Sequence, residues 1–193
     1  MERGATHVCV GLTEADPGAL AGACAVLTGL GLGAQPERVD GRHAVVTVGD
    51  LAASGLAAGA GAGFALRDGM ARARTALAEL RHAGVAGCCG GVGPQRVLAL
   101  LAADLAEAGA VFALTRADVP GVLWPLPVER LAGIGGATAA ALRRSGILTV
   151  GDVVAAGPGW LGARFGARSH ELWSAALGRD ATPAASEQRR RGA

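Results

Sequence analysis

The feature that most constrains this 193-residue chain is a change in its hydrophobic pattern near residue 119. Before it, β-rich segments alternate with stretches of helical length in the order β-α-β-α-β-α-β, which is typical of a layered α/β or α+β domain. After it, only helical stretches with short connections follow. We therefore predict an α/β (α+β) domain with a mixed sheet over residues 1–118, a small all-α domain over residues 119–180 and a disordered basic tail over residues 181–193.

The individual elements follow from clusters of β-branched residues, from turn residues and from helix caps. In the first domain we expect strands at residues 7–12, 43–48, 85–92 and 111–114, and helices at residues 17–30, 62–82 and 94–108. In the second we expect helices at residues 128–132 and 136–145, one that begins at residue 149, and one at residues 161–177. The glycine run at residues 90–93 fits neither GxGxxG nor GxxxxGK[ST], so we interpret it as a tight strand-to-helix turn.

Composition argues against two classes of protein. Hydrophobic residues make up 51% and charged residues 18% of the chain, which excludes intrinsic disorder. The uncharged stretches at residues 17–36 and 51–66 are mainly Ala and Gly, too weakly apolar for a membrane-spanning helix.

The cysteines lack CxxC spacing and have no histidine at ligand spacing, so we expect buried thiols, no metal site and a cytoplasmic location. They are Cys9, Cys24, Cys88 and Cys89.

Charge is distributed unevenly although the formal net charge is only +2. Residues 1–118 hold nine arginines and eleven acidic residues, whereas residues 119–193 hold nine arginines and five acidic residues. A basic C-terminal third indicates an anionic partner. The alternative, a surface of ordinary solvated arginines, stays open at this point.

One segment, LAGIGGATAAALRRSGILTVGDVV, has the pattern of two helices joined by a glycine-bracketed turn with Ile134 as its apolar plug. Such a helix-hairpin-helix presents the unsatisfied N–H groups at the start of its second helix to one DNA phosphate. Contacts to the backbone make this binding independent of DNA sequence. An ordinary αα-hairpin is the alternative. The predicted DNA-binding residues are Gly133, Ile134, Gly135, Gly136, Ala137 and Thr138, with Arg143 and Arg144 as further phosphate contacts.

The same region resembles a known family. The segment LWPLPVERLAGIGGATAAALRRSGILTVGDVV and its continuation to residue 180 look like the thumb of the Y-family (translesion) DNA polymerases. The preceding GVAGCCGGVGPQRVLALLAADLA looks like the end of that family's palm. The resemblance implies a palm-like first domain, a thumb-like second domain, DNA as the partner, and a role in DNA repair and damage tolerance.

The chain departs from the family where the chemistry would occur. The family holds two magnesium ions with an Asp of its first strand and an Asp-Glu pair of a later hairpin. Here the first strand has no carboxylate at residues 8–11, and the pair is reduced to Asp40 or to Asp50, depending on the alignment. A Lys-Pro that touches the triphosphate in the family is replaced at residues 106–108 by Ala-Glu-Ala, and residues 13–40 are too few for a fingers domain.

These departures predict a non-catalytic DNA-binding accessory without cofactor, acting alone or with another repair or replication protein. Two alternatives remain. The chain could be an active polymerase or nucleotidyltransferase that holds Mg²⁺ with Asp40 and Asp50 as atypical ligands. It could also be a protein-interaction module with no role on DNA, in which the hairpin is only structural.

Overall fold

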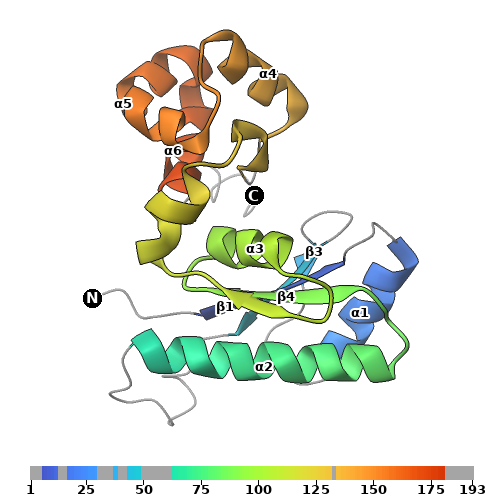
Figure 1. Ribbon diagram of the computed structural model, residues 1–193. Helices are drawn as coiled ribbons and strands as arrows, with labels where there is room; N and C mark the ends of the chain where they lie inside the picture. The colour runs from blue at the N-terminus through green and yellow to red at the C-terminus, as the bar shows by residue number, and fades with distance from the viewer. Residues whose placement is uncertain are drawn as a thin grey trace, which may run out of the picture. The chain divides into compact units, whose positions relative to one another are not determined.

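The structure, a computed structural model, describes residues 6–12, 17–29, 37–38, 43–48, 62–131 and 134–180. The chain divides into two compact units, Met1–Ala117 and Asp118–Ala193, and each is described below by itself (Figure 1). The basic tail predicted over residues 181–193 lies outside the described residues.

The first unit is built on a five-stranded sheet with the order β2-β3-β1-β4-β5. The central strand β1 (Thr6–Leu12) pairs antiparallel with β3 (His43–Val48) on one side and with β4 (Cys88–Gly93) on the other. β5 (Val111–Ala113) runs parallel to β4, and the short β2 (Glu37–Arg38) runs antiparallel to β3. The sheet is therefore mixed, as predicted, and β2 is the strand that the sequence pattern missed.

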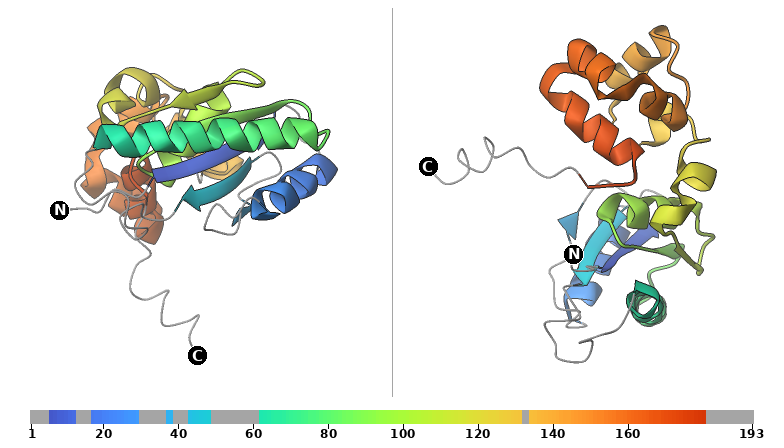
Figure 2. Two further views of the ribbon diagram at one scale, coloured as in Figure 1. Left: turned by 90° about the horizontal axis from the view of Figure 1, so that it is seen from below. Right: turned by 90° about the vertical axis from the view of Figure 1, so that its left-hand side faces the viewer.

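Three helices cover the two faces of this sheet (Figures 1 and 2). α1 (Pro17–Gly29) and α2 (Ala62–His82) lie against one face, and α3 (Arg96–Leu105) lies against the other. Because helices pack on both faces of the sheet, the unit has three layers, helix, sheet and helix. This α/β architecture confirms the predicted fold class.

Alternating side chains of β1 divide the core between the two layers. Val10 packs in one cluster with Leu27 of α1 and Leu80 of α2, and all three are fully buried. Cys9, the next residue along the strand, instead packs against Ala99 and other small residues of α3. Each buried leucine contributes about 1.5–3 kcal/mol relative to an exposed one, so these clusters hold the layers together.

The glycine run lies inside strand β4, so the prediction of a strand-to-helix turn at residues 90–93 is wrong. A Cβ atom at Gly91 would overlap the carbonyl oxygen of Ala99 and the backbone nitrogen of Ala103 in α3. One at Gly93 would come within 2.9 Å of the Ala99 nitrogen. Glycine is needed here because α3 packs directly on the strand backbone, not because the chain turns.

None of the four cysteines, all among the described residues, forms a disulfide. Cys88 and Cys89 point to opposite faces of β4: Cys88 joins the cluster beneath α1 and α2, and the Sγ of Cys89 donates to the Ala103 carbonyl oxygen of α3 at 3.2 Å. Burial, with a smaller effect of the neighbouring Cys89, raises the pKa of the Cys88 thiol. The prediction of buried thiols thus holds for Cys9, Cys88 and Cys89.

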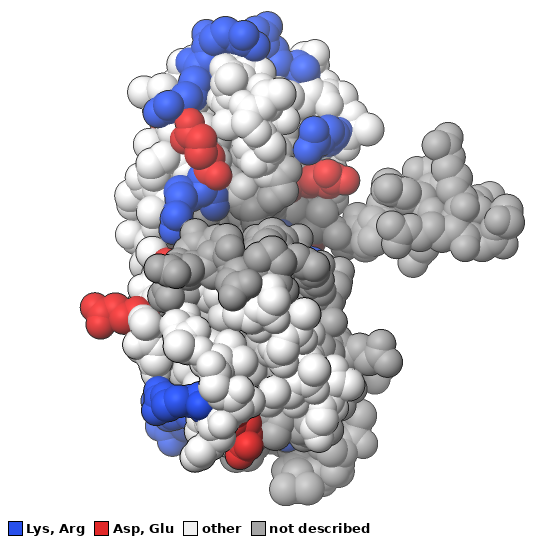
Figure 3. All heavy atoms as spheres, turned by 90° about the vertical axis from the view of Figure 1, so that its right-hand side faces the viewer, with Lys and Arg blue, Asp and Glu red and all other residues white. Residues whose placement is uncertain are grey.

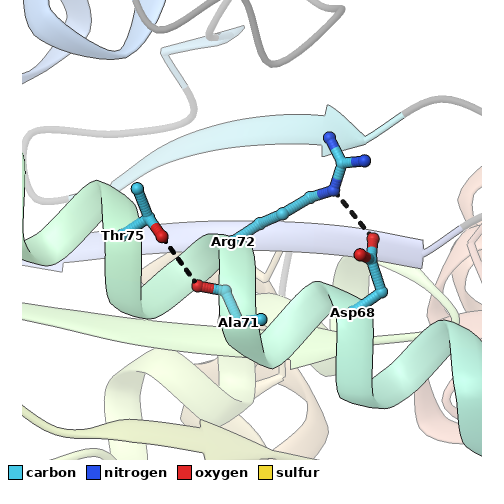
Figure 4. A network of polar contacts seen from close by, with 4 residues as sticks. All are labelled: Asp68, Ala71, Arg72 and Thr75. Atoms are coloured by element: carbon cyan, nitrogen blue, oxygen red, sulfur yellow. Dashed lines mark hydrogen bonds and ion pairs between the residues drawn. The ribbon is translucent and has the colours of Figure 1, made fainter.

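The outer face of α2 carries polar side chains. Arg72 and Asp68, one helical turn apart, form an ion pair of 2.7 Å, and the Thr75 hydroxyl donates to the Ala71 carbonyl oxygen at 3.2 Å (Figure 4). Both charged side chains are about a third exposed, so the pair contributes only about 0.3–0.5 kcal/mol. The helix ends at His82, and Gly84, with a positive φ of 81°, lets the chain turn away so that the Val85 N–H donates to the Leu80 carbonyl oxygen at 2.9 Å.

The second unit is all-helical, as predicted. A π-turn (Val119–Leu123) and a 3₁₀ turn η3 (Val128–Arg130) precede α4 (Gly136–Arg144), α5 (Val150–Phe165), the 3₁₀ turn η4 (Gly166–Arg168) and α6 (Ser169–Ala176). The predicted helix over residues 161–177 is interrupted, because Gly166 takes a positive φ of 57° and ends α5. Within the described parts of the chain, no helix combines the length and the apolar character needed to cross a membrane.

Candidate nucleic-acid interface

The base of the predicted hairpin is fixed by backbone hydrogen bonds. The Val128 N–H donates to the Leu148 carbonyl oxygen at 2.9 Å, and the Val150 N–H donates to the Leu126 carbonyl oxygen at 3.0 Å. Between them Pro127 and Thr149 form an antiparallel bridge. The segment between these two strand-like contacts, which contains η3 and α4, is therefore closed at its base.

The element before the turn is shorter than predicted. η3 is a 3₁₀ turn of three residues instead of a helix over residues 128–132, and the N–H of Ile134 donates to the Leu131 carbonyl oxygen at 3.2 Å. Leu131 is buried and Ile134 is half-buried, which fits the apolar plug that the pattern predicts. Gly133 lies outside the described residues.

Gly135 and Gly136 begin α4 with an open surface. Gly135 is the N-cap, with an extended backbone (φ −82°, ψ 161°) that any residue can adopt. A Cβ atom at either glycine would meet no other atom within 4 Å. Neither backbone conformation nor packing within the unit requires glycine at these two positions. The missing side chains instead leave the backbone open to a group that approaches from outside.

The first turn of α4 has N–H groups to offer such a group. Its first intrahelical hydrogen bond runs from the Ala139 N–H to the Gly135 carbonyl oxygen at 3.0 Å, and no side chain caps the helix at Gly135. Helix geometry therefore leaves the N–H groups of Gly136, Ala137 and Thr138 without a partner in the helix. Together with the partial positive charge of a helix N-terminus, they form a site suited to an anion.

The two arginines predicted beside the hairpin lie at the other end of α4. Arg143 and Arg144 are in its last turn, about 12 Å along the helix axis from Gly136. Both are exposed, and Arg143 forms an ion pair of 3.0 Å with Glu129. The structure does not bring them to the uncapped N–H groups, and their contact with DNA stays a prediction.

A different arginine reaches the start of α4. Nη1 of Arg168, in η4, lies 3.5 Å from the hydroxyl oxygen of Thr138, thirty residues earlier in the chain. Sequence reasoning missed this arginine because nothing in the local pattern connects η4 with α4. In the space-filling view, arginine side chains gather along the upper edge of the helical unit (Figure 3).

α5 begins immediately after the hairpin with a capping box. The Asp152 carboxylate accepts hydrogen bonds from the N–H groups of Thr149 at 2.8 Å and Leu148 at 3.0 Å, and the Asp152 N–H donates to the Thr149 hydroxyl at 3.2 Å. The backbone N–H of Thr149, followed by that of Leu148, lowers the pKa of the Asp152 carboxyl. The cap fixes the segment that closes the base of the hairpin.

We expect this cap to make the stability of the helical unit depend on pH. Since the folded pKa of Asp152 lies below its ordinary value of 3.8, the charged cap stabilises the folded state above that value. That stabilisation is lost as the pH falls through the folded pKa. Asp152→Asn should lower the midpoint of thermal unfolding by a few degrees at pH 7 and by less as the pH is lowered below 3.8, measured by tryptophan fluorescence. An equal difference at pH 7 and below pH 3.8 would contradict the assignment.

Among the described strands, only the two-residue β2 carries a carboxylate, that of Glu37. β1, β4 and β5 carry no carboxylate, and Mg²⁺ is bound by oxygen ligands. Cys9, in the middle of β1, is buried against α3. No group of three or more His, Cys, Asp or Glu able to hold a metal ion occurs in the described segments. Asp40 and Asp50 both lie outside those segments.

Comparison with known proteins covers both units. Residues 116–147 match the family model described as the IMS family HHH motif. The DNA polymerase IV of Moorella thermoacetica is 40% identical over 93 residues, which are 48% of this chain and 23% of that protein. The DNA polymerase IV of Salmonella choleraesuis is 37% identical over 101 residues, which are 52% of this chain and 29% of that protein.

Solved structures show the same fold. DinB from Sulfolobus solfataricus superimposes with a TM-score of 0.63 at 21% identity, covering 86% of this chain and 47% of that one. A chimeric Y-family DNA polymerase gives a TM-score of 0.65 at 21% identity, covering 86% and 46%. The chain thus spans less than half the length of the relatives it matches.

The mixed-sheet unit followed by a helical unit is thus a fold that this chain shares with these solved structures. In sequence, the chain is similar to the Y-family DNA polymerases of the DNA polymerase IV (DinB) type.

Proposed function

We propose that this protein binds the sugar-phosphate backbone of DNA through the hairpin before α4, independently of base sequence. The observation that carries the proposal is the uncapped first turn of α4, which two glycines leave open to an approaching group. Backbone N–H groups recognise a phosphate but read no base, so such contacts give affinity without sequence preference.

The relatives support DNA as the ligand. The proteins similar to this chain are named DNA polymerases, and one similar structure is described as an insertion ternary complex of Dbh DNA polymerase. The chain spans under half the length of such proteins, so we propose only DNA binding from this similarity and not their complete activity.

We further propose that the protein acts on DNA as a non-catalytic accessory in damage tolerance, in the cytoplasm and together with another repair or replication protein. Phosphoryl transfer by two metal ions needs carboxylates that clamp both ions, and β1, β4 and β5 supply none. The second candidate is an active polymerase, favoured by the 40% identity to DNA polymerase IV and dependent on Mg²⁺ at Asp40 and Asp50.

One assay of DNA binding and primer extension can test both candidate functions. We expect a labelled primer-template to be bound but not extended when Mg²⁺ or Mn²⁺ and all four nucleotides are present. The logarithm of the binding constant should fall with the logarithm of salt concentration with a slope of about −1 to −2, since each phosphate contact contributes about −0.9. Primer extension that is lost in Asp40→Asn or Asp50→Asn would establish the second candidate. A strong preference for one DNA sequence would contradict the backbone contact.

A further inference from the structure

The outer edge of β5 pairs with no other described strand. β5 is the last strand in the sheet order and runs parallel to β4. The Ala110 carbonyl oxygen and the Leu114 N–H form hydrogen bonds to β4, at 2.8 Å and 2.9 Å. Backbone groups alternate in direction along a strand, so those of Val111 and Ala113 point away from β4. β5 has neither a proline nor a charged residue that would hinder pairing with a further strand.

The side of this edge that lies toward α3 is apolar. Val111 and Ala113 pack with residues of α2, so Phe112 between them points to the other face of the sheet. Its register partner in β4 is Gly91, which α3 covers. Phe112 is 42% exposed and Leu105, the last residue of α3, is 38% exposed. Both side chains therefore offer apolar surface beside the open edge.

The side of the edge that lies toward α2 is basic. Arg67, Arg74 and Arg81 are exposed and seven residues apart, so they form a row with steps of about 10.5 Å along the helix. Arg67 and Arg74 flank Met70, which packs with the β5 side chains, at helical spacings of three and four. Nη2 of Arg81 lies 3.3 Å from where a Cβ atom of Gly109 would stand, two residues before β5.

The arginine row has no acidic neighbours on its own helix. Every residue three or four positions from Arg67, Arg74 or Arg81 is uncharged. None of the three arginines forms an ion pair with another residue of the described segments. The nearby pair of Asp68 and Arg72 lies outside the row. Three positive charges thus line one flank of α2 without compensation there.

We propose that this edge, formed by β5 and the arginine row of α2, binds an extended acidic segment of a partner protein as an additional strand. The added strand would form backbone hydrogen bonds with Val111 and Ala113. Its side chains would alternate between the two faces, with Asp or Glu toward the arginine row and apolar residues toward Phe112. An alternating acidic and apolar pattern therefore defines the partner.

The row fits such a strand better than it fits a DNA backbone. Side chains on one face of a strand recur about every 6.6 Å along a nearly straight line, so three or four carboxylates can face the row of about 21 Å. The phosphates of a duplex wind around it and border a narrow and a wide groove in turn. A straight row with equal steps therefore meets them at unequal distances, and the neighbouring Phe112 offers nothing to a phosphate.

The test is the affinity of the full chain for a fluorescein-labelled peptide of alternating valine and glutamate, about ten residues long, measured by fluorescence anisotropy. We expect saturable binding that weakens as salt is added. The same peptide with every backbone nitrogen methylated keeps its charge but cannot donate hydrogen bonds, and an isomer with its valines and glutamates in two blocks cannot sort them between two faces. Both should bind at least about tenfold more weakly. Equal binding of all three peptides, or no binding of the alternating one, would overturn the proposal.

Variants of the protein locate the peptide. Arg67→Gln, Arg74→Gln and Arg81→Gln combined should raise Kd for the alternating peptide about tenfold, because three ion pairs are lost. Ala113→Pro removes an outward N–H but no hydrogen bond to β4, so it should also raise Kd about tenfold. Far-UV circular dichroism establishes that each variant is folded, and the methylated peptide tests strand pairing on the unchanged protein.

A second triple variant is the matched control, since it changes the net charge equally. It replaces by Gln three exposed arginines of the helical unit, Arg144, Arg164 and Arg179. Equal weakening of peptide binding in both triple variants would show that net charge alone is responsible, and the proposal would be overturned. It would also be overturned if the α2 triple variant weakened binding of a DNA duplex more than the control does, because the row would then bind nucleic acid.

The inference adds a surface for the partner protein of the proposed function, and it does not depend on the hairpin. Gly135→Asp should weaken DNA binding and leave peptide binding unchanged. The combined arginine variant of α2 should do the reverse. Failure of one of the two proposals is therefore distinguishable from failure of the other.

Discussion

Replacing Gly91 by alanine is expected to unfold the α/β unit under conditions in which the unchanged protein is folded. The added Cβ atom would overlap the carbonyl oxygen of Ala99 and the backbone nitrogen of Ala103. These are backbone atoms of a helix, which cannot rotate away as the end of a side chain can. α3 would have to move off the sheet and lose its contacts with Cys9, at a cost of about 3 kcal/mol or more.

The three tryptophans make this loss measurable in one unit at a time. Trp124, Trp160 and Trp173 all belong to the helical unit, so tryptophan fluorescence reports that unit alone. Far-UV circular dichroism reports both units. In urea titrations of Gly91→Ala we expect the dichroism transition of the α/β unit to move to much lower urea, while the helical unit still gives a tryptophan transition.

Gly22→Ala is the control for the same chemical change. Gly22 lies inside α1, and an added Cβ atom would only reach ordinary contact with Val85, at 4.0 Å. Alanine favours a helix over glycine by up to about 1 kcal/mol, so this variant should be as stable as the unchanged protein or more stable. A dichroism midpoint of Gly91→Ala equal to that of Gly22→Ala would show that α3 does not need the bare backbone of β4.

Elements with a strong local signal were predictable from the sequence. The β-branched run of β3 (His43–Val48) and the polar outer face of α2 (Ala62–His82) lead to the bounds that the structure has. The start of a helix at residue 149 was also predicted, and the structure shows that Thr149 and Asp152 form a capping box there. In each case the residues that define the element are neighbours along the chain.

Elements defined by contacts between distant segments were not predictable. The glycines of β4 have the local signature of a turn, yet their reason is the approach of α3, which no local pattern records. β2 has only two residues, Glu37 and Arg38, and therefore no periodicity to detect.

In the candidate site, too, the features with a local sequence signal were predictable and the contacts between distant segments were not. The turn and the uncapped start of α4 follow from the Gly-Ile-Gly pattern alone. The neighbouring charge does not, because Arg143 is near α4 in sequence but lies at its far end, whereas Arg168 is thirty residues away in sequence and touches its first turn. The contact between Arg168 and Thr138 therefore depends on how α5 ends, which only the three-dimensional structure shows.

Gly135→Asp is expected to abolish most DNA binding while leaving the protein as stable as before. Gly135 is the N-cap of α4, and aspartate is among the best N-cap residues, so the new carboxylate should stabilise the helix. It would do so by accepting hydrogen bonds from the N–H groups of the first turn, which are the groups proposed to hold a phosphate. It also places a negative charge where the phosphate would lie. We expect Kd to rise about 10- to 100-fold, together with an unchanged or higher unfolding temperature.

Two matched variants separate the parts of this effect. Gly159→Asp adds the same charge to an exposed position of α5 where a Cβ atom meets nothing within 4 Å, and it should change binding only slightly. Gly135→Ser caps the N–H groups without a charge, so it should weaken binding less than Gly135→Asp. If the Ser variant binds like the unchanged protein while the Asp variant does not, repulsion of the phosphate is responsible. If Gly159→Asp weakens binding as much as Gly135→Asp, the loss comes from net charge and the start of α4 is not the binding site.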